Sequence, residues 1–303
     1  MSAAAKPSAA FYCVADSRYF LGAVGLVNSL RVLGHDEPIR LTDCGLTPAQ
    51  RRLLAPAVEL VDAPPDTPPA LLKTIGPTRH PADVIVQLDT DLLATRQFGE
   101  LIAVAAAGKL IAFENKSDRW VPEWGQLLDL GELRRQHYLD FAALCMHSSI
   151  AAEVQPLIED RQDRIDFEQT YWGRQVPDYP LLYADQDVMN AVVASRVEAD
   201  RTVILDGRLA AVPPFPGLRV EEDATLTCAY EDGERPYVVH HHIVKPWLVP
   251  TQDGVYSRLL RRLLVGDDLA VRVPPGQIPL RFRSGLRASA ARGRINARER
   301  LRR

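Results

Sequence analysis

The chain has 303 residues, of which 47% are hydrophobic and 25% are charged, and its net charge at pH 7 is −3. This is an ordinary globular composition, long enough for one large domain or two small ones. No stretch approaches the roughly 20 apolar residues of a membrane span, which excludes an integral membrane protein with helical spans. The first ten residues contain no apolar core before the first predicted strand, so we do not expect a secretory signal.

Cysteine usage and charge distribution add two expectations. The four cysteines are scattered and form no Cys-x-x-Cys pair, which predicts buried thiols in a reducing cytoplasm; they are Cys13, Cys44, Cys145 and Cys228. Residues 281–303 hold nine arginines and one acid, a local charge of +8, so the rest of the chain carries −11. This asymmetry predicts a partner surface for the basic tail.

Strands and helices alternate in the first part of the chain. Residues 11–15 are predicted to form a short buried strand. Apolar residues then recur at helical spacing from Phe20 and stop at Gly34, and Asp16 or Ser17 can cap this helix. A strand over 39–42, a helix over 47–54 and a strand over 58–61 follow. This alternation predicts an α/β fold with a mainly parallel, doubly wound sheet and flanking helices.

The remaining elements are predicted in the same way. Residues 63–69 form a turn-rich loop, and a helix over 70–75 precedes the apolar strand 84–88. Further expectations are a strand over 109–113, partly exposed helical structure over 116–140, a surface excursion over 160–179 that could contact a ligand, a helix over 185–195 and a strand over 237–244. No linker is evident before about residue 264.

The triplet Asp89-Thr90-Asp91 closes the apolar strand 84–88. Side chains alternate across a strand, so an aspartate pair one residue apart is predicted to point both carboxylates the same way. Two convergent carboxylates suit Mg²⁺ or Mn²⁺, usually completed by a ligand's phosphates. Such a triplet occurs by chance about once in a chain of this length, and Asp185-Gln186-Asp187 is a second one, so context has to decide.

Two other acidic positions have an ordinary alternative. Asp16 follows the first strand, where open α/β sheets bind ligands, but its residue type alone favours a plain helix cap. No G-x-G-x-x-G sequence follows this strand, so the phosphate turn of a dinucleotide-binding fold is missing. Asp185 and Asp187 open a predicted helix, where acids stabilise the positive end of the helix dipole whether or not a ligand binds there.

Three consecutive histidines, His240 to His242, run into Lys245-Pro246-Trp247. On a strand His240 and His242 share one face and His241 lies on the other. Neutral imidazole suits Mn²⁺ or Zn²⁺, and Lys245 is a cation suited to phosphate. Solvated histidines on a strand edge are the alternative interpretation.

The order of these motifs resembles the retaining nucleotide-sugar glycosyltransferases of family 8. This group includes glycogenin and the bacterial lipopolysaccharide galactosyltransferases, and it has a GT-A fold. The resemblance spans about residues 10–250. It implies a GT-A-like single domain over residues 10–264, preceded by a flexible N-terminus over 1–9 and followed by a short basic C-terminal extension over 265–303.

The resemblance also implies roles for individual residues. Asp89 and Asp91 match the family's metal-binding pair, with His240 or alternatively His242 as a further metal ligand. Asp185 and Gln186 match the start of D-Q-D-x-x-N, whose first two residues face the donor sugar, and are the catalytic candidates. Donor-binding roles are implied for Ala15, Asp16, Tyr19, Lys73, Asp89, Thr90, Asp91 and Lys245.

Two segments differ from the family pattern. The family's histidine lies six residues before the lysine, where this chain has Val239, so a one-residue shortening would bring His240 into that role. The counterpart of the family's F-N-[SA]-G segment is Phe141-Ala142-Ala143-Leu144, which lacks both the asparagine and the glycine. The surroundings of the sugar are therefore altered, while the metal-binding residues match.

The resemblance implies a cytoplasmic, metal-dependent hexosyltransferase that uses Mn²⁺ or Mg²⁺. Its donor would be a UDP-sugar, its acceptor a carbohydrate or a lipid-linked hydroxyl, and the configuration at the sugar would be retained. The basic tail would bind an anionic membrane surface, and a disordered tail without function is the alternative. Nucleic acid is not expected as a partner. The alternative function is a nucleotide-sugar-binding or scaffold protein that has lost turnover.

Overall fold

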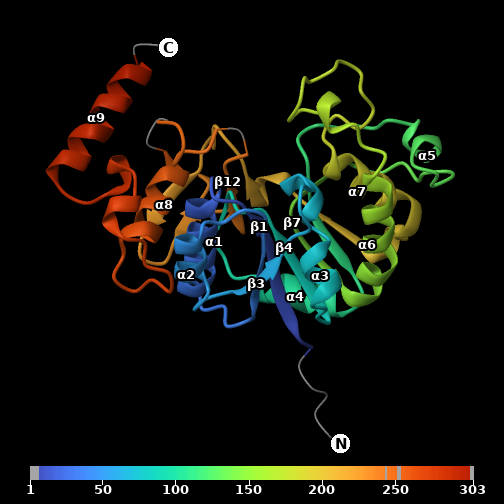
Figure 1. The fold of residues 1–303 in the computed structure, drawn as a ribbon, viewed down its shortest axis with the longest axis horizontal. Helices are drawn as coiled ribbons and strands as arrows, with labels where there is room; N and C mark the ends of the chain where they lie inside the picture. Colours follow the sequence, from blue (N-terminus) through green and yellow to red (C-terminus); the bar gives the residue numbers. More distant parts are fainter. Residues whose placement is uncertain (1–6, 243, 251–253, 301–303) are drawn as a thin grey trace, which may run out of the picture. The chain divides into compact units, whose positions relative to one another are not determined.

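The computed structural model describes residues 7–242, 244–250 and 254–300 (Figure 1). Its main sheet has seven strands in the order β3-β2-β1-β4-β7-β6-β8. β1 pairs parallel with β4 and β6 pairs parallel with β8, whereas β7 runs antiparallel to both β4 and β6. The strands are β1 (Ala9–Ala15), β2 (Ile39–Asp43), β3 (Glu59–Asp62), β4 (Val84–Leu88), β6 (Leu110–Glu114), β7 (Leu139–His147) and β8 (Thr202–Leu205). The predicted α/β fold class is confirmed.

Two compact units can be distinguished by their internal contacts. The first comprises residues 7–12, 61–88 and 99–207. In it α6 and α7 pack side by side (Figure 1), and a buried core that includes Trp124, Phe141 and Met189 lies among these helices and β7. Its helices are α3 (Ile75–Arg79), α4 (Gly99–Ala106), α5 (Trp124–Leu127), α6 (Ser148–Gln162) and α7 (Asp185–Arg196), with short 3₁₀ turns at Pro69–Leu72, Phe167–Gln169 and Ala199–Arg201.

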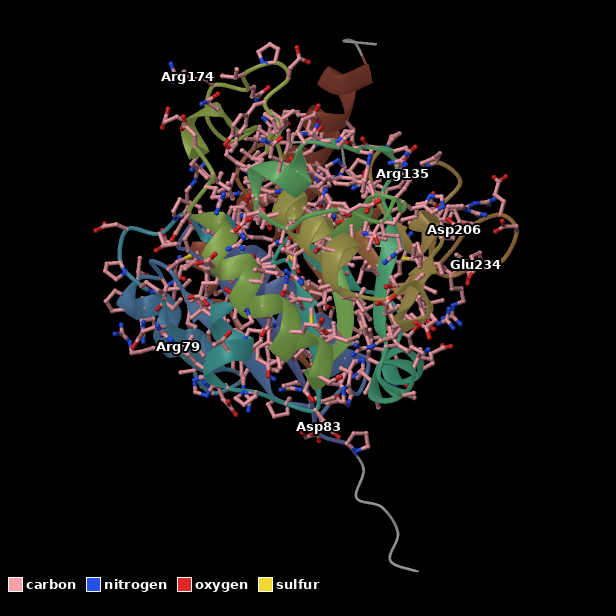
Figure 2. All side chains as sticks on the ribbon, turned by 90° about the vertical axis from the view of Figure 1, so that its right-hand side faces the viewer. Arg79, Asp83, Arg135, Arg174, Asp206 and Glu234 are labelled. Carbon is pink, nitrogen blue, oxygen red and sulfur yellow. The ribbon has the colours of Figure 1, made fainter. Side chains whose placement is uncertain are left out.

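The start of β1 is fixed in this unit by Asp83, which is labelled in Figure 2. One oxygen of its carboxylate accepts hydrogen bonds from the backbone N–H of Ser8 at 2.8 Å and from its hydroxyl at 2.9 Å. Val84 N–H donates to the Ser8 carbonyl at 2.9 Å, which sets the parallel register of β1 and β4. The predicted flexible N-terminus over 1–9 falls mostly on residues 1–6, which lie outside the described residues.

The second unit comprises residues 13–60, 89–98 and the described part of 208–300. A three-stranded sheet in the order β5-β12-β9 lies in it, and α1 packs against α8 and β5. Its further strands are β5 (Leu92–Ala94), β9 (Ala210–Ala211), the antiparallel pair β10 (Arg219–Glu222) and β11 (Thr227–Ala229), and β12 (Val238–His240). Its helices are α1 (Phe20–Val32), α2 (Pro48–Leu54), α8 (Val255–Val265) and α9 (Leu286–Arg300).

Residues beyond α8 pack within this second unit. The buried side chain of Asn28 donates to the carbonyls of Leu263 and Val271 and accepts from Val271 N–H. Phe282 is also buried, at 2% exposure. Packing therefore continues to at least residue 282, and the predicted boundary between a domain and its extension at 264/265 remains a prediction.

Three local predictions need correction. The helix expected over 70–75 is replaced by a 3₁₀ turn at Pro69–Leu72 and by α3, because Pro77 has no N–H to donate to the Lys73 carbonyl and its ring prevents a continuous helix there. The helical structure expected over 116–140 reduces to α5, and β7 begins at Leu139. The strand expected over 237–244 ends at His240, and residue 243 lies outside the described residues.

The structure also bears on the cysteines and on membrane insertion. Cys13, Cys145 and Cys228 are buried free thiols, as predicted, and Cys44 is half-buried. Burial, reinforced by the charge of Asp89, raises the pKa of the Cys13 thiol to about 12.

Over the described parts of the chain, no helix has the length and apolarity that crossing a bilayer requires.

Candidate functional site

Asp89, Thr90 and Asp91 form the turn between β4 and β5 in the second unit. Leu92 N–H donates to the Asp89 carbonyl at 3.1 Å, and the Thr90 hydroxyl donates to the Val14 carbonyl at 2.9 Å. Strand alternation is therefore not what aligns the carboxylates, because both lie past the last residue of β4. They converge nevertheless. Asp89, Asp91 and His240 each offer one ligand atom, and these three atoms lie within 4.8 Å of one another.

The pairing of β12 with β5 brings the histidine to the aspartates. These strands are antiparallel and His240 is opposite Leu92, so Asp91 lies one residue beyond the pair. His241 N–H donates to the Asp91 carbonyl at 3.1 Å, and His240 Nε2 lies 3.2 Å from Asp91 Oδ1. The backbone hydrogen bonds between the two strands thus continue one residue past β12, and they fix the distance between the His240 imidazole and the Asp91 carboxylate.

The Asp91 carboxyl is buried, at 6% exposure, between two cationic or potentially cationic side chains. Lys245 Nζ donates to Asp91 Oδ2 and, at 3.0 Å, to the His241 carbonyl. Burial by itself opposes ionisation, but the charges and hydrogen bonds of His240 and Lys245 outweigh it, so the pKa of Asp91 lies far below its usual range. Asp91 is therefore an anion at neutral pH.

These three side chains fit a divalent cation by ligand type. Two carboxylates and an imidazole suit Mn²⁺ well and Mg²⁺ less well, since Mg²⁺ prefers oxygen alone. Asp91 Oδ1 is buried, and the polar atom that faces it is His240 Nε2. A lone pair in that position can be satisfied by a proton on the imidazole or by a cation that both groups bind.

The other two histidines lie in different surroundings. The His241 ring contacts Tyr256 edge-on at 5.2 Å between centroids, and burial followed by the charge of Lys245 lowers its pKa to about 4. His242 is exposed, with its ring 5.3 Å from that of His240, and it is not in the ligand cluster. The structure thus places His240 with the aspartates and leaves His242 outside that group.

Alanine substitutions should separate the three histidines. His240→Ala is expected to lower Mn²⁺ affinity in the presence of UDP by at least roughly tenfold, because even the outer partners of metal ligands commonly contribute that much. His242→Ala should leave Mn²⁺ affinity unchanged. His241→Ala should chiefly lower the melting temperature, since the contact with Tyr256 is lost. Calorimetric Mn²⁺ titration and thermal unfolding measure both effects, and a largest loss of affinity in His242→Ala would contradict the assignment.

The residues after β1 form a tight turn in the same unit. Ala15 ends the strand, and Asp16 Oδ1 accepts the backbone N–H groups of Arg18 at 2.8 Å and Tyr19 at 2.9 Å. Tyr19 is the N-cap of α1, so neither Asp16 nor Ser17 caps the helix as predicted. Asp16 instead shapes the turn that presents Tyr19.

Tyr19 lies beside the Lys245-Pro246-Trp247 segment. Lys245 Nζ is 5.6 Å from the Tyr19 ring centroid, and Trp247 meets the same ring edge-on at 6.0 Å. Trp247 Nε1 also donates to the Arg18 carbonyl at 2.7 Å. Two segments more than 220 residues apart in sequence therefore meet beside Asp91.

Gly22 allows this close approach, which sequence inspection did not detect. A Cβ added at Gly22 would lie 2.2 Å from the Thr90 carbonyl oxygen and 2.7 Å from the Trp247 ring. Only a residue without a side chain lets the first turn of α1 lie against the Asp89–Asp91 turn. Gly22 therefore belongs to the structural requirements of this site.

The first unit holds the two catalytic candidates, Asp185 and Gln186, at the first turn of α7. Lys73 Nζ lies 3.0 Å from Asp185 Oδ2, and the Asp185 side chain is only 4% exposed. Gln186, between two buried aspartates, is half-buried. The sequence proposed donor contacts for Lys73 and Asp185 separately, and the structure joins them in one ion pair.

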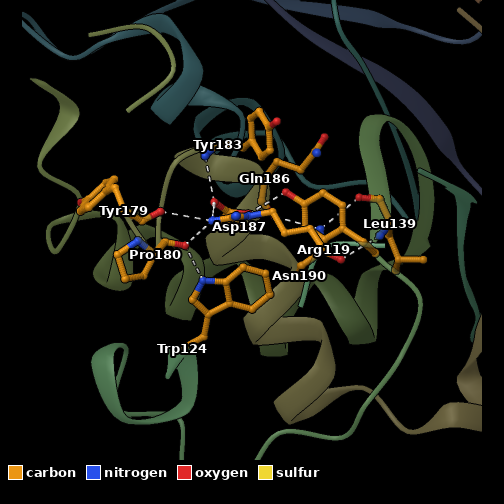
Figure 3. Close-up of polar contacts among 10 residues, drawn as sticks. Arg119, Trp124, Leu139, Tyr179, Pro180, Tyr183, Gln186, Asp187 and Asn190 are labelled. Atoms are coloured by element: carbon orange, nitrogen blue, oxygen red, sulfur yellow. Dashed lines mark hydrogen bonds and ion pairs between the residues drawn. The ribbon is translucent and has the colours of Figure 1, made fainter. Parts of the chain in front are cut away.

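Asp187, the third residue of the triplet, is fully buried at 0% exposure (Figure 3). Its Oδ1 accepts from Arg119 Nε at 2.9 Å and from the Tyr138 hydroxyl at 2.7 Å. Its Oδ2 accepts from Arg119 Nη2 at 3.2 Å and from Tyr183 N–H at 2.8 Å. Burial raises the pKa of Asp187, although the hydrogen bonds and charge of Arg119 oppose this shift. Both carboxylate oxygens are therefore fully engaged.

Sequence inspection missed Arg119 and Tyr138 because both fall in the stretch interpreted as an exposed helix. The periodicity of that stretch carries no information about a contact 68 residues away in sequence. A weak signal does exist in the triplet itself. Apolar residues, Ala184 and Val188, stand on both sides of it, and an acid that becomes buried in such a segment needs a partner.

Comparison with known proteins shows similarity of fold alone. No protein-family profile matches the sequence, and no curated protein sequence matches it significantly. The structure of the galactosyltransferase LgtC, in complex with donor and acceptor sugar analogs, aligns with a TM-score of 0.57 and 15% identity over 89% of this chain and 100% of LgtC. The bifunctional glycosyltransferase WbbM aligns with a TM-score of 0.54 and 14% identity over 89% of this chain and 51% of WbbM. The predicted GT-A-like fold is confirmed.

Proposed function

We propose that this chain is a metal-dependent glycosyltransferase that moves a hexose from a UDP-sugar to an acceptor hydroxyl with retention of configuration. The observation that carries the proposal is the convergence of Asp89, Asp91 and His240 beside Lys245. Three ligands for a divalent cation and one buried ammonium form a site for a diphosphate rather than for a neutral ligand. The GT-A-like fold agrees with this chemistry.

The proposal assigns the nucleotide to the residues around the Asp89–Asp91 turn. Asp89, Asp91 and His240 would hold Mn²⁺ or Mg²⁺, which would supply positive charge against the departing UDP. Lys245 contacts the same phosphates as a second positive charge. The backbone around Ala15 and Thr90, together with Asp16 and Tyr19, contacts the uridine and its ribose.

In this proposal Asp185 and Gln186 orient the sugar, with Lys73 beside Asp185. In the transfer the bond from the anomeric carbon to the phosphate oxygen breaks, and a bond to the acceptor oxygen forms on the same face. The acceptor's proton passes to the leaving phosphate. Front-face attack is favoured over a covalent intermediate, because Asp187 has both oxygens engaged and Asp185 is paired with Lys73.

A nucleotide-sugar-binding protein without turnover is the second candidate. Residues Phe141 to Leu144, which lie within β7, motivate it, because they lack the asparagine that resemblance to family 8 leads one to expect. Both candidates bind UDP-sugar, whereas only the enzyme hydrolyses it slowly in the absence of an acceptor. Release of UDP therefore separates them.

The test uses the full chain with four donors: UDP-glucose, UDP-galactose and their N-acetyl forms. We expect thermal stabilisation that requires Mn²⁺, since a ligand at a hundred times its dissociation constant adds about 2.7 kcal/mol to the free energy of unfolding. Mn²⁺-dependent UDP release with one of these donors would support the enzyme. Stabilisation without release would favour the binding protein, and absence of both with every donor would refute the nucleotide-sugar assignment.

The proposal extends to a lipid-linked acceptor and an anionic membrane surface that binds α9. Leu286 is 90% exposed at the start of this helix, and Arg287 and Arg294 are exposed along it. Each basic residue near an anionic surface contributes roughly 1 kcal/mol. The predicted positions Arg302 and Arg303 lie outside the described residues, as do the side chains of Arg298 and Arg300.

Truncation of residues 286–303 should abolish binding to anionic vesicles while sparing UDP binding. The truncation begins after Arg281 and Phe282, because Arg281 donates to the Pro246 carbonyl at 2.9 Å and Phe282 is buried. Binding of the full chain should also weaken as salt rises, since the attraction is electrostatic. Sedimentation with anionic and neutral vesicles measures both, and Arg287→Gln/Arg294→Gln should give an intermediate loss. Binding that survives truncation would contradict the proposal.

A further inference from the structure

The backbone has an unusual conformation at Ala184, immediately before the catalytic candidate Asp185. Ala184 is fully buried, with φ +44° and ψ −113°. A residue with a Cβ rarely adopts a positive φ, and such a conformation persists only where the surrounding contacts impose it.

Asp187 holds the turn from the helix side. Its Oδ2 accepts the N–H of Tyr183, the residue before Ala184, at 2.8 Å, while Ala184 N–H donates to the Leu181 carbonyl at 2.9 Å. The carboxylate thus bonds back across the turn that precedes it. A carboxylate can do this only if its own direction is fixed.

Arg119 fixes that direction, as Figure 3 shows. Its Nε and Nη2 reach the two oxygens of Asp187 at 2.9 and 3.2 Å. The same Nη2 donates to the Pro180 carbonyl at 2.7 Å, and Trp124 Nε1 donates to that carbonyl at 2.7 Å as well. One guanidinium therefore joins the chain before the turn to the helix after it.

We propose that Arg119 is a positioning residue that maintains the Ala184 turn and thereby the placement of Asp185 and Gln186. The inference rests on the proposed function in so far as it concerns turnover. A lysine cannot replace this arginine, because a single ammonium cannot bond both oxygens of Asp187 and the Pro180 carbonyl in one plane. Arg119 acts through Asp187 and does not itself contact substrate.

The test is a double-mutant cycle between Arg119→Lys and Ala184→Gly, on the full chain. Glycine adopts a positive φ without strain, so the turn no longer depends on Arg119 once position 184 is glycine. Arg119→Lys alone should lower kcat by roughly 10- to 100-fold, as small misplacements of catalytic groups do, with Mn²⁺-dependent UDP affinity unchanged. In the Ala184→Gly background, Arg119→Lys should lower kcat much less.

Hydrogen exchange supplies a readout that is independent of activity. The amides of Gln186 and Val188, which donate to the Tyr183 and Ala184 carbonyls, should exchange faster in Arg119→Lys and recover in the double variant. Arg134→Lys is the matched control, because Arg134 donates to the Val197 carbonyl at the other end of α7, at 2.7 Å. It should alter stability without changing kcat.

The outcomes separate the positioning role of Arg119 from the proposed function. Unchanged exchange in Arg119→Lys, or an equal loss of kcat in both backgrounds, would overturn the positioning role. A lower melting temperature with normal kcat would also overturn it, since a purely structural arginine behaves in that way. No transfer and no hydrolysis by the unsubstituted protein would refute the proposed function instead, while the exchange measurements would still decide whether Arg119 maintains the turn.

Discussion

Asp91→Asn is expected to abolish Mn²⁺-dependent UDP binding and to lower turnover by about a hundredfold or more. The substitution keeps the shape of the side chain but removes the negative charge from a position 3.2 Å from His240 Nε2. Asp89→Asn, in the same turn, should have the same effect on Mn²⁺ dependence. Titration of UDP with and without Mn²⁺, followed by turnover at saturating metal, measures both variants.

The two variants should differ in folding stability. Asp91 is the buried partner of Lys245, which is 8% exposed. Asp91→Asn leaves this ammonium without its counter-charge and should lower the free energy of unfolding by about 3–5 kcal/mol. Asp89 is only half-buried, so Asp89→Asn should lower the free energy of unfolding much less. Asp223→Asn, which breaks an exposed ion pair with Arg258 in the same unit, is the control for the substitution itself. Mn²⁺-dependent UDP affinity that persists in both site variants would refute the metal assignment.

The parts of this fold that sequence predicts are those set by local pattern. Apolar spacing locates α1, and Gly34, with φ +83°, ends it as expected. The Thr47 cap, which exchanges hydrogen bonds with Gln50, starts α2 where the sequence places it. The convergence of Asp89 with Asp91 was predicted correctly, but for the wrong reason, since a turn rather than a strand aligns them.

Contacts between distant segments were not predictable from pattern. His240 reaches Asp91 because β12 pairs with β5, and nothing local to either strand specifies that register. β7 lies antiparallel between two other strands, so the alternation of strands and helices gives no hint of it. Arg119 and Asp187 form a buried pair, and nothing in the segment around Arg119 indicates a partner 68 residues away.

Lys245→Met should have opposite effects on two affinities. Its ammonium bonds Asp91 Oδ2 and therefore occupies part of the carboxylate that a cation would use. Methionine keeps the apolar stem but removes a buried positive charge, so affinity for Mn²⁺ alone should rise. Affinity for UDP in the presence of Mn²⁺ should fall by roughly 10- to 100-fold, because a charge-assisted hydrogen bond to phosphate is worth about 1.5–3 kcal/mol.

This divergence distinguishes Lys245 from the metal ligands, since Asp91→Asn should lower both affinities together. Lys245→Arg is the matched control: it keeps the charge, so Mn²⁺ affinity should stay near that of the unsubstituted protein. Calorimetric titration of Mn²⁺ alone, and then of UDP at saturating Mn²⁺, gives both quantities for each variant. UDP affinity unchanged in Lys245→Met would remove the phosphate contact from the proposal. A fall in affinity for Mn²⁺ alone would show instead that Lys245 supports the metal site by holding Asp91 in place, through its further hydrogen bond to the His241 carbonyl.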